Sequence, residues 1–356
     1  MDGLAFTGQR SDDPHLTLPC KTGEGRKGAR LTTSRALWSA LLLALPALWP
    51  LLRPGFFISD DGRFHVYRIA ALAEAWRQGV SYPRLFPEFG FGYGQAVLNY
   101  YAPLSYYPAA LLTFLGLGPA TAMQLALALG FLLAAWAAYG YARSLWGPAG
   151  GVLAAVAYTY FPYHLADAYL RGALPEHFAF VWPPLILWAY VAAFREEKPL
   201  RPLLWGALAW AALVCTHNLT ALLMAPVTAF YLLLLACWTG RWQRLPVVLS
   251  SLALTLGLSA AFWLPALAES RYVGISLGPS DGYQRHLAPL ESLIDFSLFY
   301  RYPPTGAPYH PLSWLSVLLL LVVLILVVRI ALTKPPPPPS PATRLPLPTS
   351  ENVKFE

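Results

Sequence analysis

Long apolar runs recur along most of this chain and are separated by short polar segments. A transmembrane helix needs about 20 mostly apolar residues, and somewhat fewer where the bilayer is thin. The pattern predicts about eight spans, at 36–52, 120–142, 149–163, 177–194, 202–217, 220–238, 246–266 and 312–331. We therefore expect an all-α polytopic membrane protein.

The polar segments between the spans indicate the orientation. Basic residues occupy the loops at Arg143, 195–201 and 241–244, and basic loops remain on the cytoplasmic side. Eight spans and a cytoplasmic N-terminus place all three loops inside, provided that 103–118 lies at the interface instead of crossing. Its two prolines and flanking tyrosines favour such an interfacial helix. The predicted outer loops are 53–119, 164–176 and 267–311.

The two ends of the chain differ from its centre. Residues 1–35 are polar and basic and predict a cytoplasmic tail, followed by a transmembrane domain over 36–331. No small-residue cleavage site follows the first span, so we interpret that span as a retained anchor. The proline-rich stretch 332–356 predicts disorder.

Composition supports the membrane assignment and limits the classes of partner that we expect. Charged residues make up only 12% of the chain and hydrophobic residues 56%, whereas soluble domains carry about 25% charged residues. The net charge of +7 comes from the tail and the loops, so it does not indicate nucleic acid. Three cysteines without ligand spacing predict neither a disulfide framework nor a zinc site. We expect the lipid bilayer of the inner (plasma) membrane as the main partner.

An acidic pair, Asp60 and Asp61, follows the first span. Carboxylates near hydrocarbon are costly, so they are candidates for function. An amphipathic helix predicted at about 62–78 would place Asp61, His65 and Arg68 on one face. The alternative is that Ser59 or Asp60 only caps this helix, which explains one acid better than two.

The second outer loop carries another charged group. His164, Asp167 and Arg171 would share a helix face, although Asp167 and Arg171 could form a simple i,i+4 ion pair. Glu176 opens the next span, either as a site residue or as a first-turn acid favoured by the helix dipole.

Three further polar residues border spans. His217 and Asn218 lie at the predicted outer end of 202–217, where such a pair either serves a site or joins neighbouring helices. Arg271 follows the span 246–266 and would either reach lipid headgroups or bind a lipid phosphate.

The order of these features resembles the GT-C glycosyltransferases, integral membrane enzymes that use polyprenyl-linked sugars. The resemblance rests on an order of elements: one span, an outer loop that opens with an acidic pair, juxtamembrane amphipathic helices and then many spans. The region 103–118 and the span ending at 141–147 look like those of aminoarabinose- and mannose-transferring members. The resemblance implies that Asp60 is the loop-one acid with Asp61 as its neighbour, and that Glu176 is the acid of the second outer loop. It also implies that His217 lies near a polar position that often faces the lipid-phosphate site.

A narrower resemblance covers about 36–331. The segments 60–65, 169–176, 216–218 and 263–269 resemble the bacterial "6-pyruvoyl-tetrahydropterin synthase-related" membrane proteins. The name does not imply pterin chemistry, because nothing here matches the three-histidine zinc site of that soluble enzyme. Members of the family continue into more spans and often a soluble outer domain, so the resemblance implies a C-terminally truncated chain or a frame-shifted gene.

The implied function is sugar transfer from a polyprenyl-phosphate donor to a cell-envelope acceptor at the outer face, with inversion. The resemblance gives the catalytic candidates Asp60, Asp61 and Glu176, and substrate-binding candidates at His65, Arg68, Asp167, Arg171, His217, Asn218 and Arg271. A divalent cation between carboxylate and phosphate is an option, but arginines can replace it. The alternatives are a transporter or flippase for lipid-linked or anionic solutes, and an inactive fragment of such an enzyme.

Overall fold

The computed structural model describes residues 24–273, with side chains from 34 onward, together with 294–295, 312–313, 318, 321, 322 and 325. Two strands of two residues each, β1 (Ile294–Asp295) and β2 (Leu312–Ser313), pair in parallel. The other described elements are helices.

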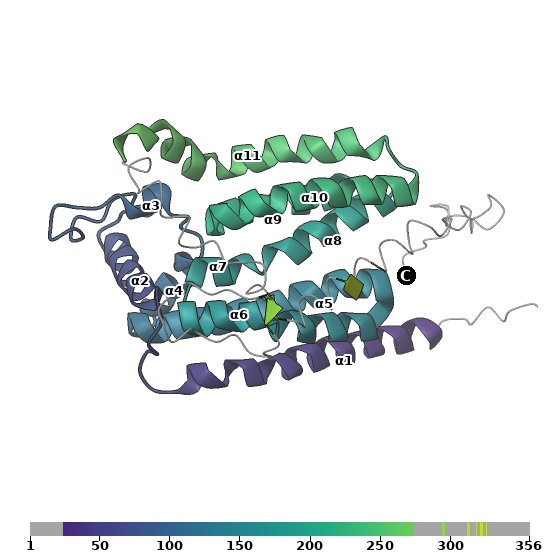
Figure 1. Cartoon of the computed structure of the whole chain (residues 1–356), viewed down its shortest axis with the longest axis horizontal. Helices are drawn as coiled ribbons and strands as arrows, with labels where there is room; N and C mark the ends of the chain where they lie inside the picture. Colours follow the sequence, from purple (N-terminus) through teal and green to yellow (C-terminus); the bar gives the residue numbers. More distant parts are fainter. Residues whose placement is uncertain are drawn as a thin grey trace, which may run out of the picture.

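The long helices form the body of the molecule. They are α1 (Glu24–Ala44) with its 3₁₀ extension η1 (Leu45–Leu52), α5 (Pro119–Thr159), α8 (Trp182–Arg195), α9 (Leu200–Thr216), α10 (Asn218–Thr239) and α11 (Arg244–Ala268). The remaining described helices connect them: α2 (Gly62–Arg77), α3 (Val97–Tyr100), α4 (Tyr106–Thr113), α6 (Pro162–Ala166), a π-helical turn η2 (Asp167–Arg171), α7 (Leu174–Ala179) and η3 (Ser270–Tyr272). Figure 1 shows the long helices side by side, with α2, α3 and α4 at one end.

Within the described residues, five helical segments are long and apolar enough to cross a membrane. They are Ser34–Leu52, Pro119–Thr159, Leu174–Arg195, Asn218–Thr239 and Arg244–Ala268. The apolar helix α9 is shorter, with 17 residues. The chain is therefore a helical membrane protein with several apolar helices. The count of eight spans stays a prediction, because most of 312–331 lies outside the described residues and two predicted spans fall within α5.

Helix α5 is two helices joined by a sharp turn. Gly147 has φ 76° and ψ −175°, a conformation that glycine tolerates, and Pro148 cannot continue the preceding helix. A Cβ on Gly151 would lie 2.9 Å from the Tyr139 carbonyl oxygen. In one continuous helix these residues would be about 18 Å apart. The chain thus folds back at Gly147, and the arms cover the predicted spans 120–142 and 149–163.

The loops sort to the two ends of the bundle. At one end Arg195 donates to the Ser144 carbonyl at 2.7 Å, and Arg241 donates to the Phe194 carbonyl at 2.6 Å. At the other end the Leu104 amide donates to the Cys215 carbonyl at 2.8 Å. The basic loops therefore share one end, opposite to the segment 53–119. That this basic end faces the cytoplasm remains a prediction.

The segment 103–118 does not form a spanning helix. Its helix, α4, has eight residues and is about 12 Å long, far short of the roughly 30 Å hydrocarbon core. Tyr106, Ala109 and Ala110 are buried in the same apolar cluster as Ile69 and Leu72 of α2. Helix α4 thus supports α2, the amphipathic helix expected at 62–78.

Candidate functional site

The acidic pair is docked on the segment 164–176 through its backbone. The Asp60 amide donates to the Leu170 carbonyl at 3.1 Å, and the Asp61 amide donates to the Arg171 carbonyl at 2.8 Å. These hydrogen bonds join segments that are more than 100 residues apart in the sequence. The two acidic regions singled out by the sequence therefore meet.

Gly172 makes this docking possible. It ends the π-helical turn in the left-handed conformation, with φ 64° and ψ 29°, which costs glycine little. A Cβ there would lie 2.5 Å from Ser59 Oγ and 3.1 Å from Gly62 Cα. Because such distances are closer than van der Waals contact, only glycine lets the two segments approach this far. π-Helical turns are frequent at functional sites.

Arg171 is the centre of the docked cluster. Its Nη1 lies 2.9 Å from Tyr163 Oη and 2.9 Å from Asp167 Oδ1, and it also forms an ion pair with Glu176. The Tyr163 hydroxyl donates to Glu176 Oε1 at 2.6 Å. One guanidinium thus holds two carboxylates, and the Asp167–Arg171 pair, for which a simple i,i+4 contact was the alternative, is part of a larger network.

Asp167 is fully buried, and its Oδ2 has no hydrogen-bond partner among the described residues. Burial raises the pKa of this carboxyl well above its usual range; the negative charges of Glu176 and Asp61 add to the rise, and Arg171 opposes it. For Arg171, burial lowers the pKa, but Glu176 and Asp167 outweigh it and the net pKa is raised. The two neighbouring carboxyl groups thus stabilise the Arg171 cation.

On α2, the side chains of His65 and Arg68 both form hydrogen bonds with the Tyr106 hydroxyl. Tyr106 Oη lies 2.7 Å from His65 Nδ1 and accepts a hydrogen bond from Arg68 at 3.0 Å. The Arg68 guanidinium also stacks on Tyr101, 4.3 Å from the ring centre. Burial, followed by the charges of Arg68, Arg171 and His217, lowers the pKa of His65 to about 3. His65 is therefore neutral at physiological pH.

The N-cap position of α2 is occupied by Asp61, and not by Ser59 or Asp60 as the capping alternative has it. Asp61 makes no capping hydrogen bond with its side chain. Its carbonyl accepts the His65 amide at 3.2 Å, which any residue could provide. The Asp61 carboxylate has no capping role, and its charge acts on Asp167 and Tyr101.

His217 belongs to the same neighbourhood. It is half-buried at the N-cap of α10, with Nδ1 2.7 Å from Thr220 Oγ1. Burial lowers its pKa, Glu176 raises it, and Arg171 lowers it further. These electrostatic effects place His217 near both members of the central ion pair.

Two predicted site residues do not join the cluster. The exposed Asn218 accepts the neighbouring Leu219 amide at its own Oδ1, 3.1 Å away. Arg271 is exposed in η3 and contacts only Tyr272 among the described residues. His164 is placed beside the cluster but faces inward. It packs on Phe180 with ring centres 4.2 Å apart, and burial lowers its pKa to about 4.

Sequence reasoning missed three tyrosines of the site. Tyr163 contacts Arg171 and Glu176, whereas Tyr101 and Tyr106 contact Arg68. Tyrosines near a membrane boundary usually indicate interfacial anchoring, so no signal separated these three from the others. Nor does the structure bring three His, Cys, Asp or Glu side chains together as metal ligands within the described residues. The divalent cation remains a prediction.

The fold defines a helical membrane protein with several apolar helices. The partly buried charged cluster around Arg171 forms a polar site at one end of the bundle. The chain belongs to the membrane-protein family described as "6-pyruvoyl-tetrahydropterin synthase related domain; membrane protein", whose model matches residues 98–333. This confirms the family predicted from the motifs. The match includes the Arg171 cluster, whereas the acidic pair lies before it.

A curated relative from Lactococcus lactis subsp. cremoris (strain MG1363), described as an uncharacterized protein, is 22% identical over 256 residues. The alignment covers 69% of this chain and 42% of that protein, so this chain spans less than half of the relative. The relative's description names no activity.

Proposed function

We propose that this protein is a membrane glycosyltransferase that moves a sugar from a polyprenyl-phosphate donor to a cell-envelope acceptor at the outer face. One observation carries the proposal. Asp60 and Asp61, of which Asp61 makes no capping hydrogen bond, are docked by backbone hydrogen bonds against a partly buried carboxylate–arginine–carboxylate cluster. Charged groups concentrated at a membrane boundary are costly and typical of functional sites.

The chemistry would be a displacement at the anomeric carbon. An acceptor hydroxyl forms the new C–O bond while the bond from that carbon to the phosphate oxygen breaks, so that the configuration inverts and polyprenyl phosphate leaves with the electron pair. A carboxylate takes the hydroxyl proton, a contribution of about 10²–10⁴-fold. Cations stabilise the negative charge that develops on the leaving phosphate.

The geometry supports a division of roles. Asp61 is our candidate base, with Asp60 as its neighbour. Arg171 is held by Asp167 and Glu176, so we assign it to positioning. Arg68 makes no ion pair with the described carboxylates and is held by two tyrosines, which leaves its charge available for a phosphate.

A transporter or flippase for lipid-linked solutes is the second candidate. Buried Asp167 in a π-helical turn between short helices resembles the broken helices and buried ionisable groups of transporters. Such a protein would move the lipid-linked sugar across the membrane without cleaving it.

The test uses purified full-length protein in lipid nanodiscs. A panel of synthetic polyprenyl-phosphate sugars would be incubated with permeabilised cell envelopes as acceptor, with and without a chelator, and the released polyprenyl phosphate measured by mass spectrometry. We expect release that Asp61→Asn abolishes and that Glu197→Gln, at the opposite end of the bundle, leaves intact. Movement of intact donor in proteoliposomes without any release would support the transporter and contradict the enzyme.

A further inference from the structure

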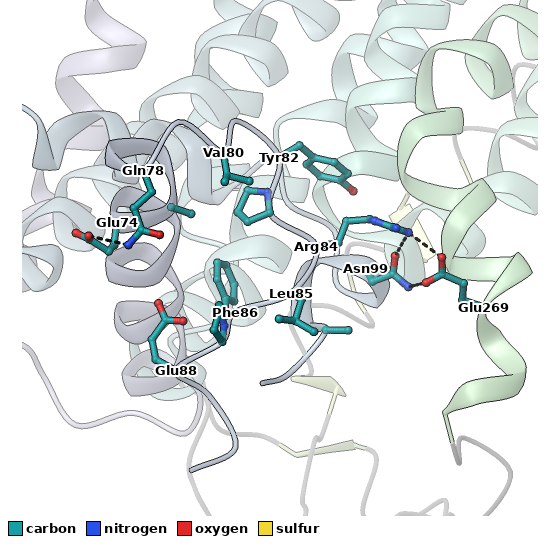
Figure 2. Close-up of a pocket in the computed structure, with 14 residues that line it drawn as sticks. Glu74, Gln78, Val80, Tyr82, Arg84, Leu85, Phe86, Glu88, Asn99 and Glu269 are labelled. Carbon is teal, nitrogen blue, oxygen red and sulfur yellow. Dashed lines mark hydrogen bonds and ion pairs between the residues drawn. The ribbon is translucent and has the colours of Figure 1, made fainter. Parts of the chain in front are cut away.

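A pocket of about 910 Å³ opens between the C-terminal part of α2, the segment 80–88 and the end of α11. Figure 2 shows two groups of polar side chains at opposite sides of the pocket, with Leu85 and Phe86 between them. Glu74, Gln78 and Glu88 lie on one wall, and Arg84, Asn99 and Glu269 on the other. None of these residues belongs to the cluster around Arg171.

The second wall is a closed hydrogen-bonded ring. Arg84 Nη1 lies 2.8 Å from Glu269 Oε1 and 3.1 Å from Asn99 Oδ1, and Asn99 Nδ2 donates to Glu269 Oε2 at 2.9 Å. Asn99 is buried, and the Tyr100 hydroxyl donates to the Glu269 carbonyl at 2.9 Å. This ring fixes the first outer segment to α11, so the wall is pre-organised.

The charges on the two walls do not cancel. Arg84 offsets Glu269, and Arg77, which does not line the pocket, offsets Glu74, which also accepts a hydrogen bond from Gln78. Glu88 makes no hydrogen bond or ion pair within the part of the chain that the structure describes. One carboxylate is thus left to bind a positive group, in a protein whose overall charge is +7.

Two further features of the pocket restrict the chemical class of its ligand. Val80 and Leu85 add exposed apolar surface to a pocket that is otherwise rich in carboxylate and amide groups, a combination that suits the C–H faces and hydroxyls of a saccharide. Glu74 and Glu88 also line a second pocket of about 610 Å³ that includes Arg68. The two pockets therefore adjoin, and the second leads toward the proposed phosphate contact.

We propose that the larger pocket binds a hydroxyl-rich saccharide carrying a free amine, and that Glu88 pairs with its ammonium group. Phosphorylated or carboxylated sugars are disfavoured there by the charge of Glu88. The pocket would hold the acceptor, so this assignment rests on the proposed function. The proposed donor-phosphate contact, Arg68, lines only the adjoining smaller pocket of the two.

The test is isothermal titration of the detergent-purified full chain with three trisaccharides: glucosamine trimer, its N-acetylated form and galacturonic acid trimer. We expect the glucosamine trimer to bind most tightly and the galacturonic acid trimer most weakly. Glu88→Gln should weaken the glucosamine trimer about fivefold and leave the N-acetylated trimer within about twofold. Glu197→Gln, an exposed carboxylate at the other end of the bundle, should change neither.

The proposal is overturned if galacturonic acid trimer binds as tightly as glucosamine trimer, if neither amine nor acetylated trimer binds, or if Glu88→Gln leaves the amine trimer unaffected. Asp61→Asn separates the two hypotheses, since it should abolish transfer but retain binding of glucosamine trimer. Transfer by a wild-type protein that does not bind the trimer contradicts only the pocket assignment. Binding without transfer contradicts only the proposed function.

Discussion

Replacing Gly172 with alanine should separate the acidic pair from the Arg171 cluster. Alanine in the left-handed conformation costs about 1–2 kcal/mol. The added methyl would also lie 2.5 Å from Ser59 Oγ and 3.1 Å from the Gly62 backbone, and overpacking of this kind costs about 1–3 kcal/mol. We therefore expect a loss of about 2–5 kcal/mol in the free energy of unfolding.

Gly240 provides a matched control. It also ends a helix in the left-handed conformation, with φ 67°, but a Cβ there would meet no atom within 4 Å. Gly240→Ala should therefore cost only the backbone term of about 1–2 kcal/mol. At roughly 2 °C per kcal/mol for a chain of this size, we expect thermal shifts of about 2–4 °C for Gly240→Ala and 4–10 °C for Gly172→Ala.

Hydrogen exchange reports the docking directly. The amides of Asp60 and Asp61 are bonded to the Leu170 and Arg171 carbonyls, so they should exchange slowly in the wild type and rapidly in Gly172→Ala. Adding Ser59→Gly removes the nearest clash and should restore part of the protection. Equal melting shifts for the two glycine variants, together with unchanged exchange at both amides, would refute the docking argument.

Three further outcomes follow from the structure. Arg171→Met should cost about 3–5 kcal/mol, because it leaves the buried Asp167 without its cation, and thermal unfolding at pH 7 measures this. The pKa of His65 is lowered from 6.5 to about 3 by burial, so only the unfolded state gains a proton as the pH falls from 6.5 toward 3. Stability should therefore decline over that range, and less steeply in His65→Gln. Single cysteines at Glu88 and Lys198 should be labelled from outside and from inside respectively; the reverse would refute the orientation.

The sequence predicted the parts of the fold that depend on local pattern. Apolar runs located the helices, including the two arms of α5 as separate spans, and the 3.6-residue periodicity located α2. These features are readable because propensity and the need to satisfy backbone groups in lipid act within one segment. The count of spans is not settled by the same reasoning, since α9 is short.

Only the charged residues of the site could be predicted from the sequence. Asp61, Arg171 and Glu176 were singled out because charges are rare in this chain, and the structure brings them together. Their tyrosine partners depend on tertiary packing that no spacing shows. The contact of Arg84 with Glu269 joins residues 185 positions apart, beyond any local signal.

The central claim is that Asp61, or its neighbour Asp60, is a catalytic base. Asparagine caps a helix about as well as aspartate but cannot accept the proton in transfer. The decisive measurement is therefore the rate of polyprenyl-phosphate release by Asp60→Asn and Asp61→Asn, with the melting temperature recorded for each. We predict near-normal melting for both and a loss of at least about 10² in rate for one of them. Near-normal rates in both variants would contradict the claim and leave the acidic pair with a structural role.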